Sequence, residues 1–222
     1  MPVSNDPQTS ISLRQNVIGE NTPPKPPEPG RLSPRMVHHV AFITNDAEAT
    51  VDFYTRVMGL EFCSAVMDSR LPSTGEPLPY FHIFFRLPDG STVAFFECPG
   101  VPRREAAPHI AHRVFNHLAL EVGSRDEVDR WRDWLESQGV EAIGPVDHGI
   151  IYSVYFYDNN GLRTEITATL DPEWNRRPGE ARRHLALWKS VKAEAASSGG
   201  AFDDALFDLI EKHQAGHSAI AE

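Results

Sequence analysis

The sequence is poor in cysteine, in long apolar runs and in positive charge. Its only cysteines are Cys63 and Cys98, too few for a disulfide framework or a thiolate zinc cluster. No apolar run approaches the length of a membrane span, and the N-terminus lacks the pattern of a secretion signal. The net charge of −10 argues against binding to nucleic acid or to an anionic membrane. We therefore expect a cytoplasmic protein that acts on small molecules.

Three segments differ in composition. Residues 1–33 are rich in Pro, Ser and Asn, which is typical of a flexible arm. Residues 34–170 carry regular strand and helix signals and form the predicted central domain. Residues 171–222 predict two amphipathic helices, over 179–195 and 201–213, as a C-terminal extension. Because such helices can cover the central domain or a second subunit, we expect a homo-oligomer, a dimer or larger.

The central domain contains the same succession of elements twice, in modules at about 36–100 and 112–170. Each reads as strand, helix and three further strands, and this internal duplication predicts an α+β fold of two βαβββ modules. The first module has predicted strands over 37–43, 60–66, 80–87 and 91–97, and a helix over 48–58. The second has predicted strands over 114–120 and 140–143, a helix over 125–138, and a closing hairpin over 151–167.

Each module supplies one histidine early and one glutamate late. Aligning the first strands places His39 on His117, and aligning the closing turns pairs Glu97 with Glu165. A lone His or Glu on a strand is usually a surface residue, but four at equivalent places are much less expected by chance. Side chains alternate along a strand, so both imidazoles take the face opposite the helix. Two His and one carboxylate suit Fe(II), Mn(II), Zn or Ni and leave positions open for substrate and oxygen.

Four segments carry a resemblance to a known family, and they are HHVAFITNDAEATVDFYTRVMGLEF, LPDGSTVAFFE, FNHLALEV and YFYDNNGLRTEIT. The chain from Met36 to Leu170 resembles the vicinal oxygen chelate superfamily. That superfamily includes glyoxalase I, methylmalonyl-CoA epimerase, fosfomycin-inactivating thiol transferases, bleomycin-binding proteins and type I extradiol dioxygenases. The resemblance implies an open, barrel-like sheet formed by the two modules around a metal site. Because this fold hosts several chemistries, activity has to be argued from the site.

The sequence is most similar to the one-domain type I extradiol dioxygenases. That branch has a His at the start of each of two modules and a Glu at the end of the second, so His39, His117 and Glu165 are the implied metal ligands. It also has a further His late in the first module, for which His82 is the candidate. The implied metal is Fe(II), with Mn(II) as the second candidate. The implied reaction is the ring cleavage of a catechol-type aromatic diol with O₂.

A further similarity to this branch precedes the closing turn. His148 stands nine residues before Tyr157, the second member of a Phe-Tyr pair. The resemblance implies that His82 or His148 acts as a base and that Tyr157 donates a hydrogen bond to a developing oxyanion. The connection from Tyr157 to the turn is shorter than in the branch, and Asn159 stands where Pro is usual.

Two other functions stay open at this stage. A glyoxalase I-like or epimerase-like isomerase would use four ligands, His39, Glu97, His117 and Glu165, for proton transfer next to a carbonyl. It would need no redox chemistry and could use Zn, Ni or Co. A binding module without catalysis is the other alternative, and the retained His and Glu residues argue against it.

Overall fold

The computed structural model describes residues 34, 36–103, 109–198 and 201–218. The predicted N-terminal arm at 1–33 lies outside the described residues. The described residues form two compact units. One unit combines the described part of Pro29–Val146 with Tyr152–Ala168, and the other combines Asp147–Ile151 with the described part of Thr169–Glu222. Both predicted modules lie mainly in the first of these units.

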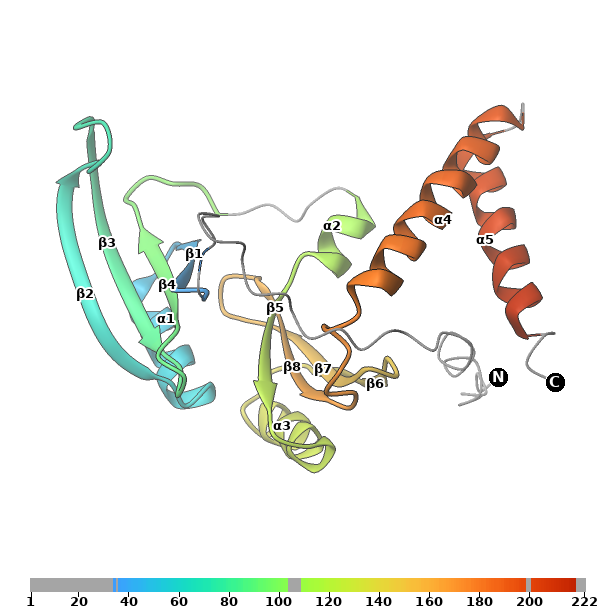
Figure 1. The fold of residues 1–222 in the computed structure, drawn as a ribbon. Helices are drawn as coiled ribbons and strands as arrows, with labels where there is room; N and C mark the ends of the chain where they lie inside the picture. The colour runs from blue at the N-terminus through green and yellow to red at the C-terminus, as the bar shows by residue number, and fades with distance from the viewer. Residues whose placement is uncertain (1–33, 35, 104–108, 199–200, 219–222) are drawn as a thin grey trace, which may run out of the picture. The chain divides into compact units, whose positions relative to one another are not determined.

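The first module is a four-stranded sheet with one helical segment (Figure 1). Its strand order is β1-β4-β3-β2, with β1 parallel to β4 and the other pairs antiparallel. The helix begins where the Asp46 side chain accepts a hydrogen bond from the Ala49 N–H. The elements are β1 (His39–Thr44), α1 (Ala47–Asp52), η1 (Phe53–Val57), β2 (Glu61–Arg70), β3 (Pro77–Arg86) and β4 (Thr92–Glu97).

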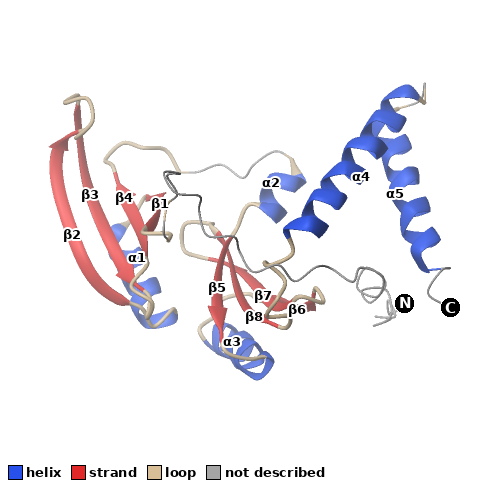
Figure 2. Ribbon diagram, in the orientation of Figure 1, coloured by secondary structure: helices blue, strands red, loops and turns tan. Residues whose placement is uncertain are grey.

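The second module repeats this arrangement, with strand order β5-β8-β7-β6. Ser124 caps its helix by accepting a hydrogen bond from the Glu127 N–H. The elements are α2 (Ile110–Phe115), β5 (Leu118–Val122), α3 (Arg125–Ser137), β6 (Ile143–Asp147), β7 (Ile151–Tyr157) and β8 (Arg163–Thr169). Figure 2 shows each group of four strands with its own helix, α1 or α3. The predicted βαβββ order of both modules is therefore confirmed.

Two strands of the second module begin later in the structure than predicted. The strand expected over 114–120 begins at Leu118, because α2 extends to Phe115. The strand expected over 140–143 lies instead at Ile143–Asp147 and contains Pro145. Proline cannot donate to a sheet but is tolerated at an edge, and β6 is an edge strand. Gly144 and Pro145 therefore belong to an edge strand.

The second compact unit contains the C-terminal helices. They are α4 (Pro178–Ser197) and α5 (Phe202–Ser218), which pack against each other. The predicted pair of C-terminal helices is confirmed. None of the described helices has the length and apolar character that crossing a membrane requires.

One hydrophobic core joins the helix sides of the two modules. It contains Phe85 and Phe95 from the first sheet and Phe156 and Ile166 from the second. The ring of Phe53 in η1 lies 6.4 Å from that of Phe156, centroid to centroid. Among the described strands, β1 pairs only with β4 and β5 only with β8, so the two sheets are open and separate. Two open sheets of four strands fit the predicted α+β fold, and each turns its helix side toward the shared core.

The closing turn of the second module is anchored on the first. Buried Asp158 accepts hydrogen bonds from the Tyr54 hydroxyl at 3.1 Å and from the backbone N–H groups of Asn160 and Leu162, each at 2.8 Å. The Thr44 hydroxyl donates to Oδ1 of Asn160 at 2.7 Å. These contacts fix the turn that leads into β8.

The Asp158 carboxyl makes the stability of this junction depend on pH. Burial raises the pKa of Asp158 above its usual value, so the folded state binds a proton there more readily than the unfolded state. The stabilisation that protonated Asp158 gives the folded state is fully present below the unfolded pKa of about 3.9, and it is lost as pH rises through the folded pKa. We expect urea unfolding to show that the free energy of unfolding of the wild type falls, relative to that of Asp158→Asn, as pH rises from about 3.9 through the folded pKa. Parallel pH profiles would contradict this account.

Candidate functional site

Glu165 and His117 meet on the open face of the second sheet, opposite its helix. The β5–β8 register pairs Ala119 with Glu165, which puts Glu165 on the same face as His117. Oε2 of Glu165 lies 2.7 Å from Nε2 of His117, and its Oε1 accepts a hydrogen bond from the Tyr155 hydroxyl at 3.1 Å. Two of the three predicted ligands therefore lie together.

The Glu165 carboxylate is only 1% exposed. A buried carboxylate is costly unless a positive charge compensates it. Within the described part of the chain its ion-pair partner is His117, which compensates it only when protonated. A divalent cation would compensate it while His117 is neutral, so the chemistry of this donor pair fits a metal.

Tyr155 completes this cluster in the place predicted for Tyr157. Burial and, secondly, the charge of Glu165 raise the pKa of Tyr155 to about 12, so its phenol stays protonated and donates. Tyr157 is 43% exposed, and its hydroxyl donates to the backbone oxygen of Arg113 at 3.5 Å. Asp158 pairs with Leu162 at the end of the hairpin, and counting three residues back along each strand places Tyr155 opposite Glu165. This pairing could have been read from the sequence. Tyr155 stands two residues farther from the turn than Tyr157 does.

His39 and His82 lie on the open face of the first sheet. The His82 ring stacks on Phe96 with centroids 3.6 Å apart and lies 3.9 Å from the Phe84 ring. The His39 ring is 6.5 Å from that of His82. Nε2 of His82 is buried without a hydrogen-bond partner among the described residues. Burial and, secondly, His39 lower the pKa of His82, so its imidazole is neutral near pH 7 and can accept a proton.

Glu97 lies on the other face of the first sheet, so its predicted equivalence to Glu165 was wrong. The β1–β4 register pairs Ala41 with Ala94, and the β5–β8 register pairs Ala119 with Glu165. Ala94 is thus the counterpart of Glu165. Glu97 follows its turn glycine by seven residues and Glu165 by four, so their faces differ. Oε2 of Glu97 accepts a hydrogen bond from the Ala47 N–H at the start of α1, at 2.7 Å.

Removing the Glu97 carboxylate should therefore affect folding and leave metal binding intact. Glu97→Ala is expected to lower the free energy of unfolding by about 0.5–2 kcal/mol, because α1 loses an acceptor at its first turn. Urea unfolding and the metal content after reconstitution check the two parts. Loss of bound metal in a folded Glu97→Ala protein would return Glu97 to the ligand set.

The predicted ligands fall into two halves within one chain. Among the described residues, no three His, Cys, Asp or Glu side chains come close enough to hold one metal ion. His39 lies beside His82, while His117 and Glu165 lie on the reverse side of the shared core. The full three-ligand set thus does not fit a metal within one chain. His148 is exposed in the turn between β6 and β7, where its backbone N–H donates to the backbone oxygen of Ile151. Its role as a base stays a prediction.

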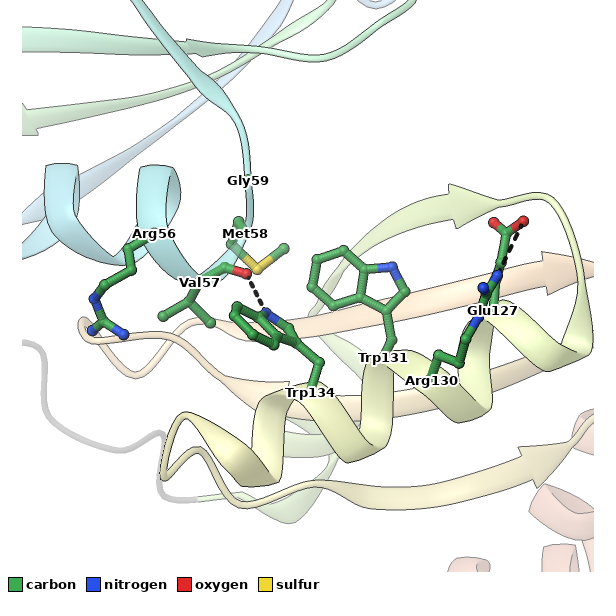
Figure 3. A pocket seen from close by; sticks show the side chains of 8 residues that line it. All are labelled: Arg56, Val57, Met58, Gly59, Glu127, Arg130, Trp131 and Trp134. Carbon is green, nitrogen blue, oxygen red and sulfur yellow. Dashed lines mark hydrogen bonds and ion pairs between the residues drawn. The ribbon is translucent and has the colours of Figure 1, made fainter.

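A separate hollow lies on the helix side, between η1 and α3. Figure 3 shows Trp131 and Trp134 of α3 directed toward Val57 and Met58. Nε1 of Trp134 donates to the backbone oxygen of Val57 at 2.8 Å. The residues that line this hollow include no histidine, so it is a junction between the modules and not part of the imidazole site.

Residues 36–166 match the profile of the Glyoxalase/Bleomycin resistance protein/Dioxygenase superfamily. The chain belongs to this superfamily. It is 28% identical over 135 residues to the Bacillus subtilis (strain 168) protein named "Putative ring-cleaving dioxygenase MhqA". That match covers 60% of this chain and 40% of the relative, so the chain spans less than half of the relative's length.

Two solved structures are similar to part of this chain. A glyoxylase/bleomycin resistance protein/dioxygenase domain from Frankia sp. EAN1pec is 17% identical, with a TM-score of 0.50 over 62% of this chain and 99% of that chain. The fosfomycin resistance protein FosX of Listeria monocytogenes, complexed with Mn(II) and sulfate, is 23% identical. Its TM-score is 0.44 over 63% of this chain and 96% of that chain.

Proposed function

We propose that the protein is a metal-dependent extradiol dioxygenase that opens the ring of a catechol-type aromatic with O₂. The observation that carries this proposal is the buried Glu165 carboxylate, held by His117 and Tyr155 on the open face of the second sheet. The similarity to a protein named as a ring-cleaving dioxygenase supports the reaction class. The isomerase alternative has less support, because the Glu97 carboxylate is bonded to α1.

Three side chains would hold the metal, namely His39, His117 and Glu165. Two imidazoles and a carboxylate favour Fe(II), with Mn(II) as the second candidate. When bound, such an ion supplies the redox chemistry and a common template for the diol and O₂.

Other side chains of the same faces have roles in proton transfer. The neutral imidazole of His82 has a nitrogen with no hydrogen-bond partner among the described residues and can accept a proton from the diol. Phe84 and Phe96, which flank it, exclude water from that transfer. The protonated phenol of Tyr155 orients Glu165 and can donate to a substrate oxygen that gains negative charge. His148 remains the second candidate for the base.

Two copies of the chain would complete the site. The shared core separates His39 from His117 within one chain, and β1 and β5 each have an edge that pairs with no other described strand. Unpaired strand edges readily pair with another chain. Pairing β1 of one copy with β5 of another would bring the two open faces together, with His39 from one copy and the His117–Glu165 pair from the other. A homodimer is therefore part of the proposed function.

Oxygen consumption tests the reaction. Protein purified without oxygen and reconstituted with Fe(II) is offered a panel of catechols, with O₂ uptake and the yellow ring-fission product recorded together. We expect one O₂ consumed per diol cleaved, and no uptake by the metal-stripped protein. Absence of uptake with every catechol, together with isomerisation of a thiohemiacetal or a CoA ester, would overturn the proposal.

A further inference from the structure

Arg163 lies on the face that carries Glu165, and among the described residues it forms no ion pair. It is the first residue of β8, two positions before Glu165, so both side chains take the same face of the second sheet. Its Cζ lies 4.4 Å from the centroid of the Tyr155 ring. The same ring meets His117 edge-on at 5.8 Å, and its hydroxyl bonds Glu165. One aromatic ring thus contacts both the guanidinium and the ligand pair.

The guanidinium has unused hydrogen-bonding capacity. Its Nε is buried without a hydrogen-bond partner, and no carboxylate in the described part of the chain forms an ion pair with it. Leaving a buried donor unpaired costs about 1–3 kcal/mol, so a ligand that accepts from it recovers that energy. A guanidinium that stacks on an aromatic ring uses its flat face and leaves the N–H groups along its edge free.

We propose that Arg163 binds a carboxylate carried by the aromatic diol, an inference that rests on the proposed function. The planar fork of guanidinium N–H groups matches the two oxygens of a carboxylate, and such pairs are strong because both partners are charged. Arg163 then selects substrates with an acidic side chain over neutral diols. The contacts that carry this inference lie within the second module alone.

A matched pair of substrates tests the proposal. 3,4-Dihydroxyphenylacetate carries the carboxylate, and 4-ethylcatechol is a neutral diol of similar size. We expect Arg163→Gln to lower kcat/KM for the acid by about 10- to 100-fold, the value of a hydrogen bond to a charged group, and to leave the neutral diol unchanged. Arg163→Lys keeps the positive charge without the planar fork of N–H groups. Its kcat/KM for the acid should lie between those of the wild type and Arg163→Gln. Arg132→Gln, which removes an exposed arginine of α3, should change neither substrate.

Binding gives a second readout. Isothermal titration calorimetry on protein loaded with Zn(II), which has no redox chemistry, should show a matching loss of affinity for the acid alone in Arg163→Gln. An equal loss for both diols would mean that Arg163 only supports Tyr155, and no loss for either would also overturn the proposal. If neither diol is cleaved by the iron-loaded protein, the dioxygenase function fails, and the calorimetry still decides the role of Arg163.

Discussion

Replacing Glu165 with Gln is expected to remove the metal and, with it, ring cleavage. The carboxylate is buried, and its partners among the described residues are His117 and Tyr155, so the amide keeps the volume and loses the charge that a cation requires. Loss of one partner of a buried charge pair costs about 3–5 kcal/mol, which corresponds to roughly 100- to 5,000-fold in affinity. Metal analysis of the reconstituted variant measures this directly.

Glu97→Gln is the matched control for that experiment. It makes the same chemical change on a strand of the other module, at a carboxylate that bonds the start of α1. The control should keep the metal content and the ring cleavage of the wild type. A folded Glu165→Gln protein that still binds metal at full occupancy would remove Glu165 from the ligand set.

Mixing two inactive variants is expected to restore activity if two copies share each site. His39→Ala removes the ligand that the first module supplies to the site, and Glu165→Ala removes a ligand that the second module supplies. After subunit exchange, half of the dimers are mixed, and each mixed dimer has one intact site. We expect about a quarter of the wild-type activity, because the two sites of a symmetric dimer are equivalent.

A second mixture controls for this result. His117→Ala and Glu165→Ala both damage the half in the second module, so every site in a mixed dimer is broken and no activity should return. Native mass spectrometry confirms that subunits have exchanged. If the mixture of His39→Ala with Glu165→Ala stays inactive after exchange, the three ligands come from the same chain.

Much of the fold could be predicted because local patterns agree with it. The duplication, the two helices ended by Gly59 and Gly139, and the alternation that puts His39 and His117 opposite the helices are all local features. The bounds of β5 and β6 were wrong where local signals compete. Val114 and Phe115 belong to α2, and Pro145 lies in an edge strand where its missing N–H costs little.

The site was harder to predict because it depends on cross-strand register. A shift of one residue exchanges the faces of a strand, and aligning turns without counting parity placed Glu97 with the ligands. Counting residues from the Asp158 turn in the same way would have identified Tyr155, and not Tyr157, as the tyrosine that faces Glu165. The division of the ligands into halves could not be predicted, since it follows from which faces share a core. That outcome depends on contacts such as Phe53 with Phe156, far apart in sequence.

The position of the bound metal tests the central claim most directly, namely that His39, His117 and Glu165 hold one ion. Crystals grown with Mn(II) or Fe(II) and measured at the absorption edge of the metal locate the ion by anomalous scattering. We expect one peak per chain in contact with His117, Glu165 and the His39 imidazole of a second copy. A peak that lacks His39, or that lies away from Glu165, would contradict the account.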